Sequence, residues 1–290
     1  MPGGAGPADE TPVVFLESVD STNAEALRRA HAGESGPLWI AAVAQTAGRG
    51  RRGRTWMSPP GNLHASLLLT DPSPSAAAPQ LAFVAGLALH DACAALAPGL
   101  AGRLALKWPN DMLCHGAKIA GILIEGEGEP VTVAIGIGVN CRHHPSTVER
   151  PATDFAEQGA DVAAPALLQA LGPTIAARLR QWDRGTGFAA IRAGWLARAV
   201  GIGHAVRVRL AERETSGLFE SIDEAGRLVL RLGDGRRETI TAGEVFPISD
   251  GSPPSAPGLT ADGRGAPLQR RSLKRMNSSL RRSAGSARSA

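Results

Sequence analysis

The 290-residue chain has no apolar run that approaches the ~18–20 residues of a membrane span. Its first residues, Met1-Pro2-Gly3-Gly4, do not form a secretory signal peptide. Its three cysteines, Cys93, Cys114 and Cys141, are odd in number and have no C-x-x-C spacing, which predicts reduced core thiols. These absences favour a cytoplasmic protein that does not act at a membrane.

Lysine is also scarce. Only Lys107, Lys118 and Lys274 occur among 31 basic residues, so arginine supplies the positive charge almost everywhere. Two of the three lysines lie on either side of Trp108-Pro109-Asn110-Asp111. This placement indicates that a compact ammonium is needed there, at a position where a guanidinium fork does not fit.

Basic charge is concentrated at the end of the chain. The net charge is +4, yet residues 251–290 hold eight basic side chains against Asp262 alone, so residues 1–250 are slightly acidic. This tail is rich in Pro, Gly, Ser and Arg and has too little apolar surface to fold, so residues 250–290 are predicted to be disordered, like residues 1–10. A solvated, inert extension and a non-specific nucleic-acid contact are the two interpretations of its charge.

The densest functional signal is the run from Gly48 to Trp56. Three glycines and four arginines alternate over Gly48–Arg54, and Trp56 follows two positions later. Glycine lets the backbone approach an anion closely, and arginine offers a planar fork of donors that keeps its charge. Ordering seven residues costs about 7–14 kcal/mol, while four charge-assisted hydrogen bonds return about 6–12 kcal/mol. The near balance predicts a loop that is mobile when empty and closes over an anionic ligand that carries a ring.

Other chemistries are disfavoured by the neighbouring residues. Gly48-x-Gly50-x-x-Gly53 matches the dinucleotide fingerprint formally, but Ser58-Pro59-Pro60-Gly61 prevents the helix that this fingerprint requires. The chain has no P-loop motif and no internal repeat. His143 and His144 follow Cys141 without a fourth ligand at a spacing typical of a metal site, so no protein-only metal cage is predicted.

Apolar patterning predicts a mixed set of elements. Strands are expected over residues 13–16, 38–44, 63–69, 104–107, 118–125 and 131–140, and helices over 22–29, 79–97, 164–182 and 187–199. After Gly201, four short alternating strands over 205–210, 214–222, 227–232 and 237–241 predict a small β-barrel that ends near Ile248.

Polar residues stand at several predicted element ends. Ser21 or Thr22 can cap the first helix, and their hydroxyls, with the Asn23 amide, could equally bind a polar ligand. Pro109 makes a rigid turn that presents Asn110 and Asp111 at a strand end. Gly136 and Gly138 lie within a strand, where the backbone can pack against a ligand, and Asn140 ends it.

Taken together, five motifs resemble the biotin–protein ligase family and occur in its order. They are Ser21-Thr22-Asn23, Gln45 to Trp56, Lys107 to Asp111, Lys118 to Glu125 and Gly136 to Asn140. The resemblance covers about residues 11–248. It implies an α+β fold: a mixed, mostly antiparallel sheet flanked by helices, like the core of class II aminoacyl-tRNA synthetases, with a C-terminal SH3-like β-barrel. The catalytic domain is then expected over 11–200 and the barrel domain over 201–249.

The resemblance also implies a two-step reaction. Biotin carboxylate attacks the α-phosphate of ATP, bound with Mg²⁺, to give biotinyl-5′-AMP, and a lysine of a biotin carboxyl carrier protein then takes the biotinyl group. The residues implied as catalytic are Lys118, Arg51 and Arg54. Biotin is expected at Ser21, Thr22, Asn23, Gln45, Gly48, Arg49, Gly50, Arg51 and Lys118. ATP is expected at Arg51, Arg54, Trp56, Asn110, Asp111 and Asn140, with Mg²⁺ near Asp111.

Two other functions compete with this interpretation. A lipoate– or octanoyl–protein ligase shares the catalytic fold, although the glycine-arginine loop with Trp56 and the C-terminal barrel favour biotin. A nucleic-acid-binding regulator is suggested by the basic loop and tail. Only about a dozen residues precede the first predicted strand, which argues against the winged helix of family members that repress transcription, so no specific DNA binding is expected. Relatives often form homodimers, and a homodimer is possible here.

Overall fold

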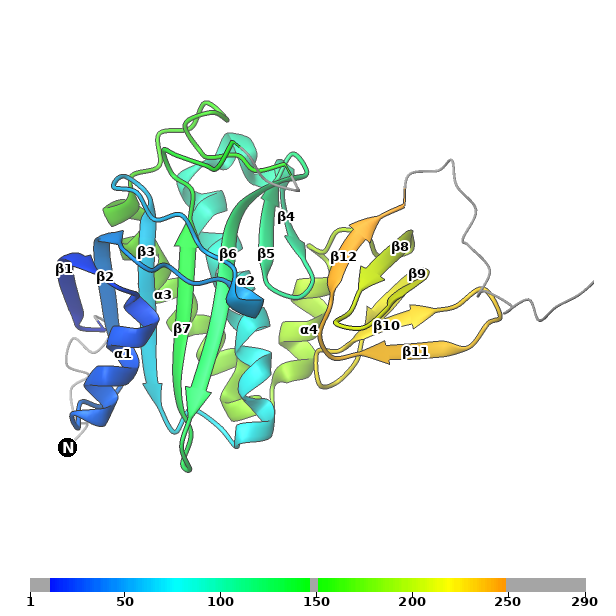
Figure 1. Cartoon of the computed structure of the whole chain (residues 1–290), viewed down its shortest axis with the longest axis horizontal. Helices are drawn as coiled ribbons and strands as arrows, with labels where there is room; N and C mark the ends of the chain where they lie inside the picture. Colours follow the sequence, from blue (N-terminus) through cyan, green and yellow to red (C-terminus); the bar gives the residue numbers. More distant parts are fainter. Residues whose placement is uncertain (1–10, 147–150, 249–290) are drawn as a thin grey trace, which may run out of the picture. The chain divides into compact units, whose positions relative to one another are not determined.

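A seven-stranded sheet forms the centre of the chain in a computed structural model, which describes residues 11–146 and 151–248 (Figure 1). The order of its strands is β1-β2-β3-β7-β6-β5-β4. These strands are β1 (Val13–Val19), β2 (Leu38–Gln45), β3 (Leu63–Thr70), β4 (Leu104–Lys107), β5 (Asp111–Cys114), β6 (Ala117–Glu127) and β7 (Thr132–Val139). Only β1 and β2 pair in parallel, so the predicted mixed and mostly antiparallel sheet is confirmed.

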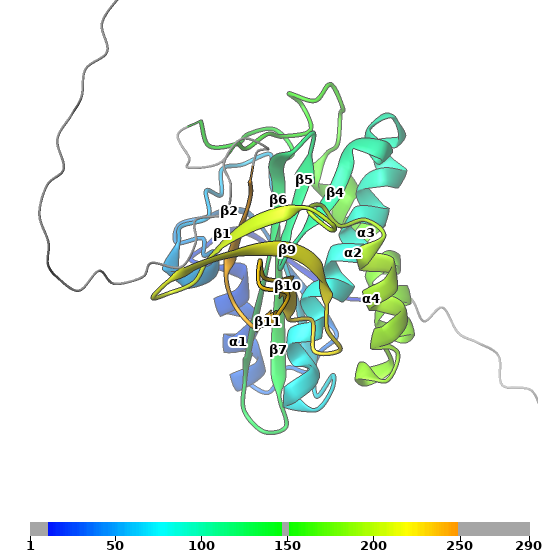
Figure 2. The ribbon, with the colours of Figure 1, turned by 90° about the vertical axis from the view of Figure 1, so that its right-hand side faces the viewer.

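Helices cover the two faces of this sheet unequally (Figures 1 and 2). Helix α1 (Thr22–His31) packs on one face, against β2, β3 and β7, through a small cluster around Ala26. On the other face, α2 (Leu81–Leu96), α3 (Ala164–Trp182) and α4 (Phe188–Leu196) bury the main core. The three helices that bury the main core therefore all lie on the face opposite α1, and the α1 face is left partly uncovered.

Strand alternation explains why the uncovered face is hollow. Side chains of a strand point to opposite faces in turn. In β7, Val133, Ile135 and Ile137 are buried in the main core, while Ala134, Gly136 and Gly138 face the α1 side. Because two of these three residues have no side chain, the sheet has a depression in front of the N-terminal end of α1.

A second, five-stranded sheet follows in the C-terminal part, with the order β11-β10-β9-β8-β12. Its strands are β8 (Ala205–Arg209), β9 (Glu214–Ile222), β10 (Leu228–Arg231), β11 (Arg237–Ile240) and β12 (Glu244–Pro247). All of its pairs are antiparallel. This sheet agrees with the predicted SH3-like fold. The predicted boundaries at 11, 201 and 250 stay predictions, and residues 1–10 and 250–290, which were expected to be disordered, lie outside the described residues.

Three expectations about elements need correction. Pro79 does not open the long helix but lies in a 3₁₀ turn, Ser75–Gln80, because the α-helix begins only at Leu81. A proline has no N–H and is tolerated in such an opening turn. Strand β5, which pairs with both β4 and β6, was not predicted, and Asp111 stands at its first position, which is a strand end as expected. Strand β12 was not predicted, because its sequence, EVFP, does not alternate apolar and polar residues.

The expectation of no membrane-length apolar run also needs refinement. The continuous stretch Ser75–Leu96 has 22 residues, and an 18-residue window within it has a mean hydropathy of 1.3, which is long and apolar enough by composition alone. In the structure 61% of this window is buried, and α2 packs against α3, α4 and the sheet. Its composition therefore agrees with that of a core helix. The three cysteines are buried and unpaired, as predicted.

Candidate active site

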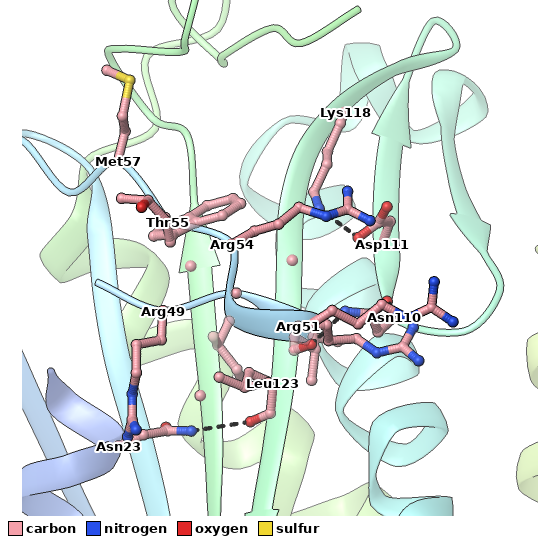
Figure 3. A pocket seen from close by; sticks show the side chains of 18 of the residues that line it. Asn23, Arg49, Arg51, Arg54, Thr55, Met57, Asn110, Asp111, Lys118 and Leu123 are labelled. Carbon is pink, nitrogen blue, oxygen red and sulfur yellow. Dashed lines mark hydrogen bonds and ion pairs between the residues drawn. The ribbon is translucent and has the colours of Figure 1, made fainter. Parts of the chain in front are cut away.

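A cavity of about 450 Å³ occupies the depression on the α1 side of the sheet. Every residue predicted for the site lines this cavity except Gly48. The predicted residues that line it are Ser21, Thr22, Asn23, Gln45, Arg49, Gly50, Arg51, Arg54, Trp56, Asn110, Asp111, Lys118 and Asn140. Figure 3 shows how residues far apart in sequence, such as Asn23, Arg51 and Lys118, converge here.

One end of the cavity is built from buried polar groups. Ser21 is the N-cap of α1, and its hydroxyl accepts from the Ala24 amide at 3.5 Å, as predicted for a capping residue. The next residue, Thr22, donates its amide (2.8 Å) and its hydroxyl (3.1 Å) to Gln45 Oε1. Gln45 Nε2 in turn donates to Ser58 Oγ at 2.8 Å. The start of α1 and the end of β2 therefore hold each other in one fixed arrangement.

Asn23 continues this network into the sheet. Ser66 of β3 lies within hydrogen-bond distance of Thr22 Oγ1 (2.7 Å) and Asn23 Oδ1 (2.6 Å), while Asn23 Nδ2 donates to Glu125 Oε2 at 2.8 Å. Gly136 makes this possible, because a Cβ there would lie 2.5 Å from Asn23 Oδ1. The predicted close approach at Gly136 is thus made by a side chain of the chain itself.

Lys118 also lines the cavity. Its ammonium is 2.6 Å from Asp111 Oδ1 and 5.4 Å from the centre of the Trp56 ring (Figure 3). Asp111 and the face of the Trp56 ring are thus the two groups that contact this ammonium in the cavity. Lys107, the other lysine near this motif, does not line the cavity. The structure therefore places one ammonium among the candidate ligand groups.

The loop that carries the arginines forms a narrow hairpin. Arg49 and Thr55 pair as a β-bridge, the Gly50 amide donates to Arg54 O at 2.7 Å, and the Trp56 amide donates to Gly48 O at 2.9 Å. A Cβ at Gly48 would lie 2.4 Å from Trp56 O, so this glycine closes the base of the hairpin and does not face the cavity. We call residues 48–56 the lid. Its predicted mobility stays a prediction.

The lid arginines differ in their partners. Arg49 pairs with Glu125 at 3.2 Å, and Arg54 pairs with Glu244 of β12 at 2.7 Å. Arg51 donates to the neutral Asn110 Oδ1 at 3.1 Å (Figure 3). Burial, together with the charge of Arg52, lowers the pKa of the Arg51 guanidinium. An arginine stays protonated nonetheless, so Arg51 is a partly buried cation that an anion would stabilise.

Trp56 lies over the glycines of the sheet. A Cβ at Gly138 would lie 2.5 Å from the indole Nε1, and a Cβ at Gly121 would lie 3.3 Å from the ring. Trp108, by contrast, is a buried core residue whose Nε1 donates to Gly226 O of the C-terminal part at 3.0 Å. Of the two tryptophans in the motifs, only Trp56 is mounted on the lid.

The last predicted lining residue follows β7. Asn140 is buried and donates to Thr153 O at 3.0 Å, which fixes the segment after residue 150 beside β7. His144 Nδ1 lies 2.7 Å from Asp154 Oδ2. Within residues 11–146 and 151–248, no cluster of three or more His, Cys, Asp or Glu side chains is arranged to hold a metal ion.

Sequence reasoning missed four residues that shape the site. Ser66 and His64 occupy alternate positions of β3, on the face opposite Leu63, Leu67 and Leu69, and two polar residues spaced in this way in an apolar strand were a signal in the sequence. Glu125 and Glu244 could not be predicted as partners of the lid. Glu125 lies 76 residues from Arg49 in the sequence, and Glu244 lies 190 residues from Arg54.

Positive charge dominates the lining. Five basic side chains line the cavity, on Lys118 and the lid, against the carboxylates of Asp111 and Glu244. A site with this balance attracts anions, and cations fixed around two anions can offset the repulsion between them. The arrangement suits a reaction that brings two negatively charged groups together.

Comparison with known proteins agrees with this geometry. The Biotin/lipoate A/B protein ligase family matches residues 15–141, and the Biotin protein ligase C terminal domain matches residues 201–246. The biotin–[acetyl-CoA-carboxylase] ligase of Paracoccus denitrificans is 48% identical over 241 residues, which are 80% of this chain and 99% of that protein. The enzyme of the same name from Mycobacterium tuberculosis is 37% identical, over 78% and 85%.

Solved structures give the same result. The biotin protein ligase from Aquifex aeolicus in complex with biotin and ATP superimposes with a TM-score of 0.69 at 28% identity, and covers 81% of this chain and 97% of that one. The fold and cavity define a ligase of the biotin and lipoate class. The identity with whole relatives and the C-terminal match narrow this further: the chain belongs to the biotin protein ligase family.

Proposed function

We propose that this protein activates biotin with ATP and transfers it to a lysine of a biotin carboxyl carrier protein. The observation that carries the proposal is the position of Lys118 and Arg51 in a single cavity that also has a buried polar end. The family and its relatives, named for this ligation, support the same chemistry.

The polar end is where we place the ring system of biotin. A ureido group has two N–H donors and a carbonyl acceptor, and Ser21, Thr22, Asn23 and Gln45 offer both kinds of partner in a fixed arrangement. The Gln45–Thr22 hydrogen bonds and the Ser66 contacts hold these partners before any ligand arrives. The backbone from Gly48 to Arg51 would close over this end.

The first chemical step then takes place at Lys118. A carboxylate oxygen of biotin attacks the α-phosphorus of ATP, the bond from this phosphorus to the bridging oxygen breaks, and pyrophosphate leaves. In this proposal Lys118 would contact both the carboxylate and the phosphate, and Arg51 and Arg54 would offset the charge that develops. Asp111 would position the Lys118 ammonium, because its Oδ1 lies 2.6 Å from Lys118 Nζ.

The nucleotide is proposed to lie under the lid. Trp56 would cover the adenine ring, and Asn110, Asp111 and Asn140 would lie along the nucleotide. Asp111 supplies an oxygen of the kind that Mg²⁺ prefers, and the ion would take its other ligands from phosphate and water. Such an ion offsets phosphate charge when it is bound.

In the second step the carrier lysine attacks the carbonyl carbon of the mixed anhydride. An amide bond forms, the carbon–oxygen bond to AMP breaks, and the amine loses its proton. The lid keeps water away from the anhydride until the amine arrives. The identity of the carrier protein and a homodimeric assembly stay predictions.

Biotin-dependent exchange between ATP and pyrophosphate tests the proposal, because it reports the first step alone. We expect exchange with biotin and little with lipoate or octanoate. Exchange that depends on lipoate or octanoate instead would assign the protein to the other branch of the family. Exchange with none of the three acids would refute acyl-adenylate formation.

A further inference from the structure

Two ring nitrogens inside the cavity have no hydrogen-bond partner. Trp56 Nε1 and His64 Nδ1 are both buried, and within residues 11–146 and 151–248 neither atom lies near a suitable partner. His64 as a whole is only 2% exposed and lines the cavity. Unpaired buried polar atoms are unfavourable, so two of them at one place require an explanation.

The two nitrogens are complementary. His64 Nε2 lies 3.1 Å from Pro59 O, and since a carbonyl oxygen only accepts, Nε2 must carry the hydrogen. Burial lowers the pKa of His64, so the ring is neutral near pH 7. Its Nδ1 is then an acceptor with a free lone pair, while the Nε1 of an indole is always a donor.

The sheet brings these two groups to the same place. His64 of β3 stands directly opposite Gly138 of β7, and residues paired in this way have Cβ positions about 4.5–5.5 Å apart. The Cβ position of Gly138 is itself 2.5 Å from Trp56 Nε1. Both nitrogens therefore lie next to Gly138, and a rotation of the indole on the lid toward β3 would bring donor and acceptor closer.

We propose that His64 is a positioning residue for the lid: its Nδ1 accepts a hydrogen bond from the indole N–H of Trp56 when the lid closes over the nucleotide. This bond fixes the plane in which the ring covers the base. The inference rests on the proposed function, in which Trp56 covers adenine. His64 itself does not contact ligand in this proposal.

A double-mutant cycle tests this coupling. His64→Leu removes the acceptor, His64→Asn keeps one at the position of Nδ1, and Trp56→Phe removes the donor but keeps a ring. In biotin-dependent exchange, we expect His64→Leu to raise the KM for ATP about three- to tenfold. The same change in the Trp56→Phe background should raise it less than twofold, and His64→Asn should restore most of the affinity. Equal increases in both backgrounds would contradict the proposal, because His64 would then act without the indole.

A spectroscopic measurement separates this inference from the proposed function. With ¹⁵N-labelled tryptophan, the indole resonance of Trp56 is assigned by its loss in Trp56→Phe. Addition of biotin and ATP should shift this proton downfield in the wild type and in His64→Asn, but not in His64→Leu. An equal shift in His64→Leu would overturn the inference even where exchange is normal. A wild-type protein that shows no exchange with biotin would instead refute the proposed function.

Discussion

The two ends of the cavity are built in opposite ways. At the polar end, Thr22, Asn23 and Ser66 are 4%, 3% and 0% exposed and are joined by short hydrogen bonds. At the lid end, the Arg49 and Arg54 side chains are 45% and 56% exposed, and each pairs with a carboxylate on another strand. One end is part of the sheet, and the other rests on it.

This difference indicates that the polar end recognises the ligand and the lid controls access to it. A buried network has one geometry and loses little entropy when a ligand binds, so it suits recognition of a fixed ring. In both lid ion pairs the guanidinium is exposed while its carboxylate is only 27% (Glu125) or 10% (Glu244) exposed, so the arginines can turn toward a ligand while the carboxylates stay fixed on their strands. A loop that must open for substrate and product cannot be held by buried contacts.

Replacement of Lys118 should give the largest loss of biotin-dependent exchange. We expect Lys118→Arg to reduce biotin-dependent exchange by about 10²–10³-fold, since the larger fork does not fit beside Asp111 and the two anions lose their shared cation. Lys107→Arg is the matched control, because Lys107 does not line the cavity. Near-normal exchange by Lys118→Arg, at an unchanged unfolding temperature, would remove Lys118 from its proposed role.

Weakening the lid end should release the intermediate. Arg51→Gly removes a partly buried cation, and with it a charge-assisted contact of about 1.5–3 kcal/mol. We expect the adenylate to escape and to biotinylate unrelated lysines, measured as labelling of a bystander protein. Arg52→Gly is the matched control at a neighbouring position whose φ of 57° suits glycine. A variant at Arg51 that labels no more bystander than Arg52→Gly does would contradict the account of the lid.

Alanine at the two glycines of β7 compares the ends directly. At Gly136 the added methyl meets Asn23, which its hydrogen bonds hold in place, so we expect the free energy of unfolding to fall by about 1–3 kcal/mol, with weaker binding of biotin. At Gly138 it meets the indole, which the lid can move, so stability should fall less while the KM for ATP rises. Gly126→Ala, where the nearest atom would be 3.4 Å away, is the control. Equal losses of stability at Gly136 and Gly138 would show that the two ends are equally rigid.

The smallest effect is expected where the lid meets the C-terminal sheet. Glu244→Gln removes the charge opposite Arg54. Because that arginine is more than half exposed, the free energy of ATP binding should fall by less than about 1 kcal/mol. We expect at most a fivefold change in the KM for ATP and an unchanged KM for biotin. A change in the KM for biotin would mean that this ion pair also supports the polar end.

Much of this architecture was predictable from sequence. The strands over Leu104–Lys107 and Glu214–Ile222 and the helix over Ala164–Trp182 have the predicted bounds, because their patterns are regular and their ends are marked. The strands β5 and β12 were missed, because their sequences, DMLC and EVFP, do not alternate apolar and polar residues.

The site was predictable as a set of residues and not as a network. Motif resemblance selected the residues that line the cavity, and the structure adds what holds them: Ser66 below Thr22, Glu125 beside Asn23, and His64 opposite Gly138. These contacts join β3, β6 and β7 to α1, and such pairings depend on sheet order, which no local pattern encodes. Gly136 was predicted to admit a ligand, and it admits Asn23 instead.

Hydrogen exchange followed by mass spectrometry tests the contrast between the two ends most directly. Peptides that cover the lid, residues 48–56, and the polar end, residues 21–25 and 64–67, are compared with and without biotin and ATP. The account predicts fast exchange in the empty lid that slows strongly with both ligands, and slow exchange at the polar end that scarcely changes. A lid already protected when empty, or a polar end that becomes ordered only with biotin, would contradict it.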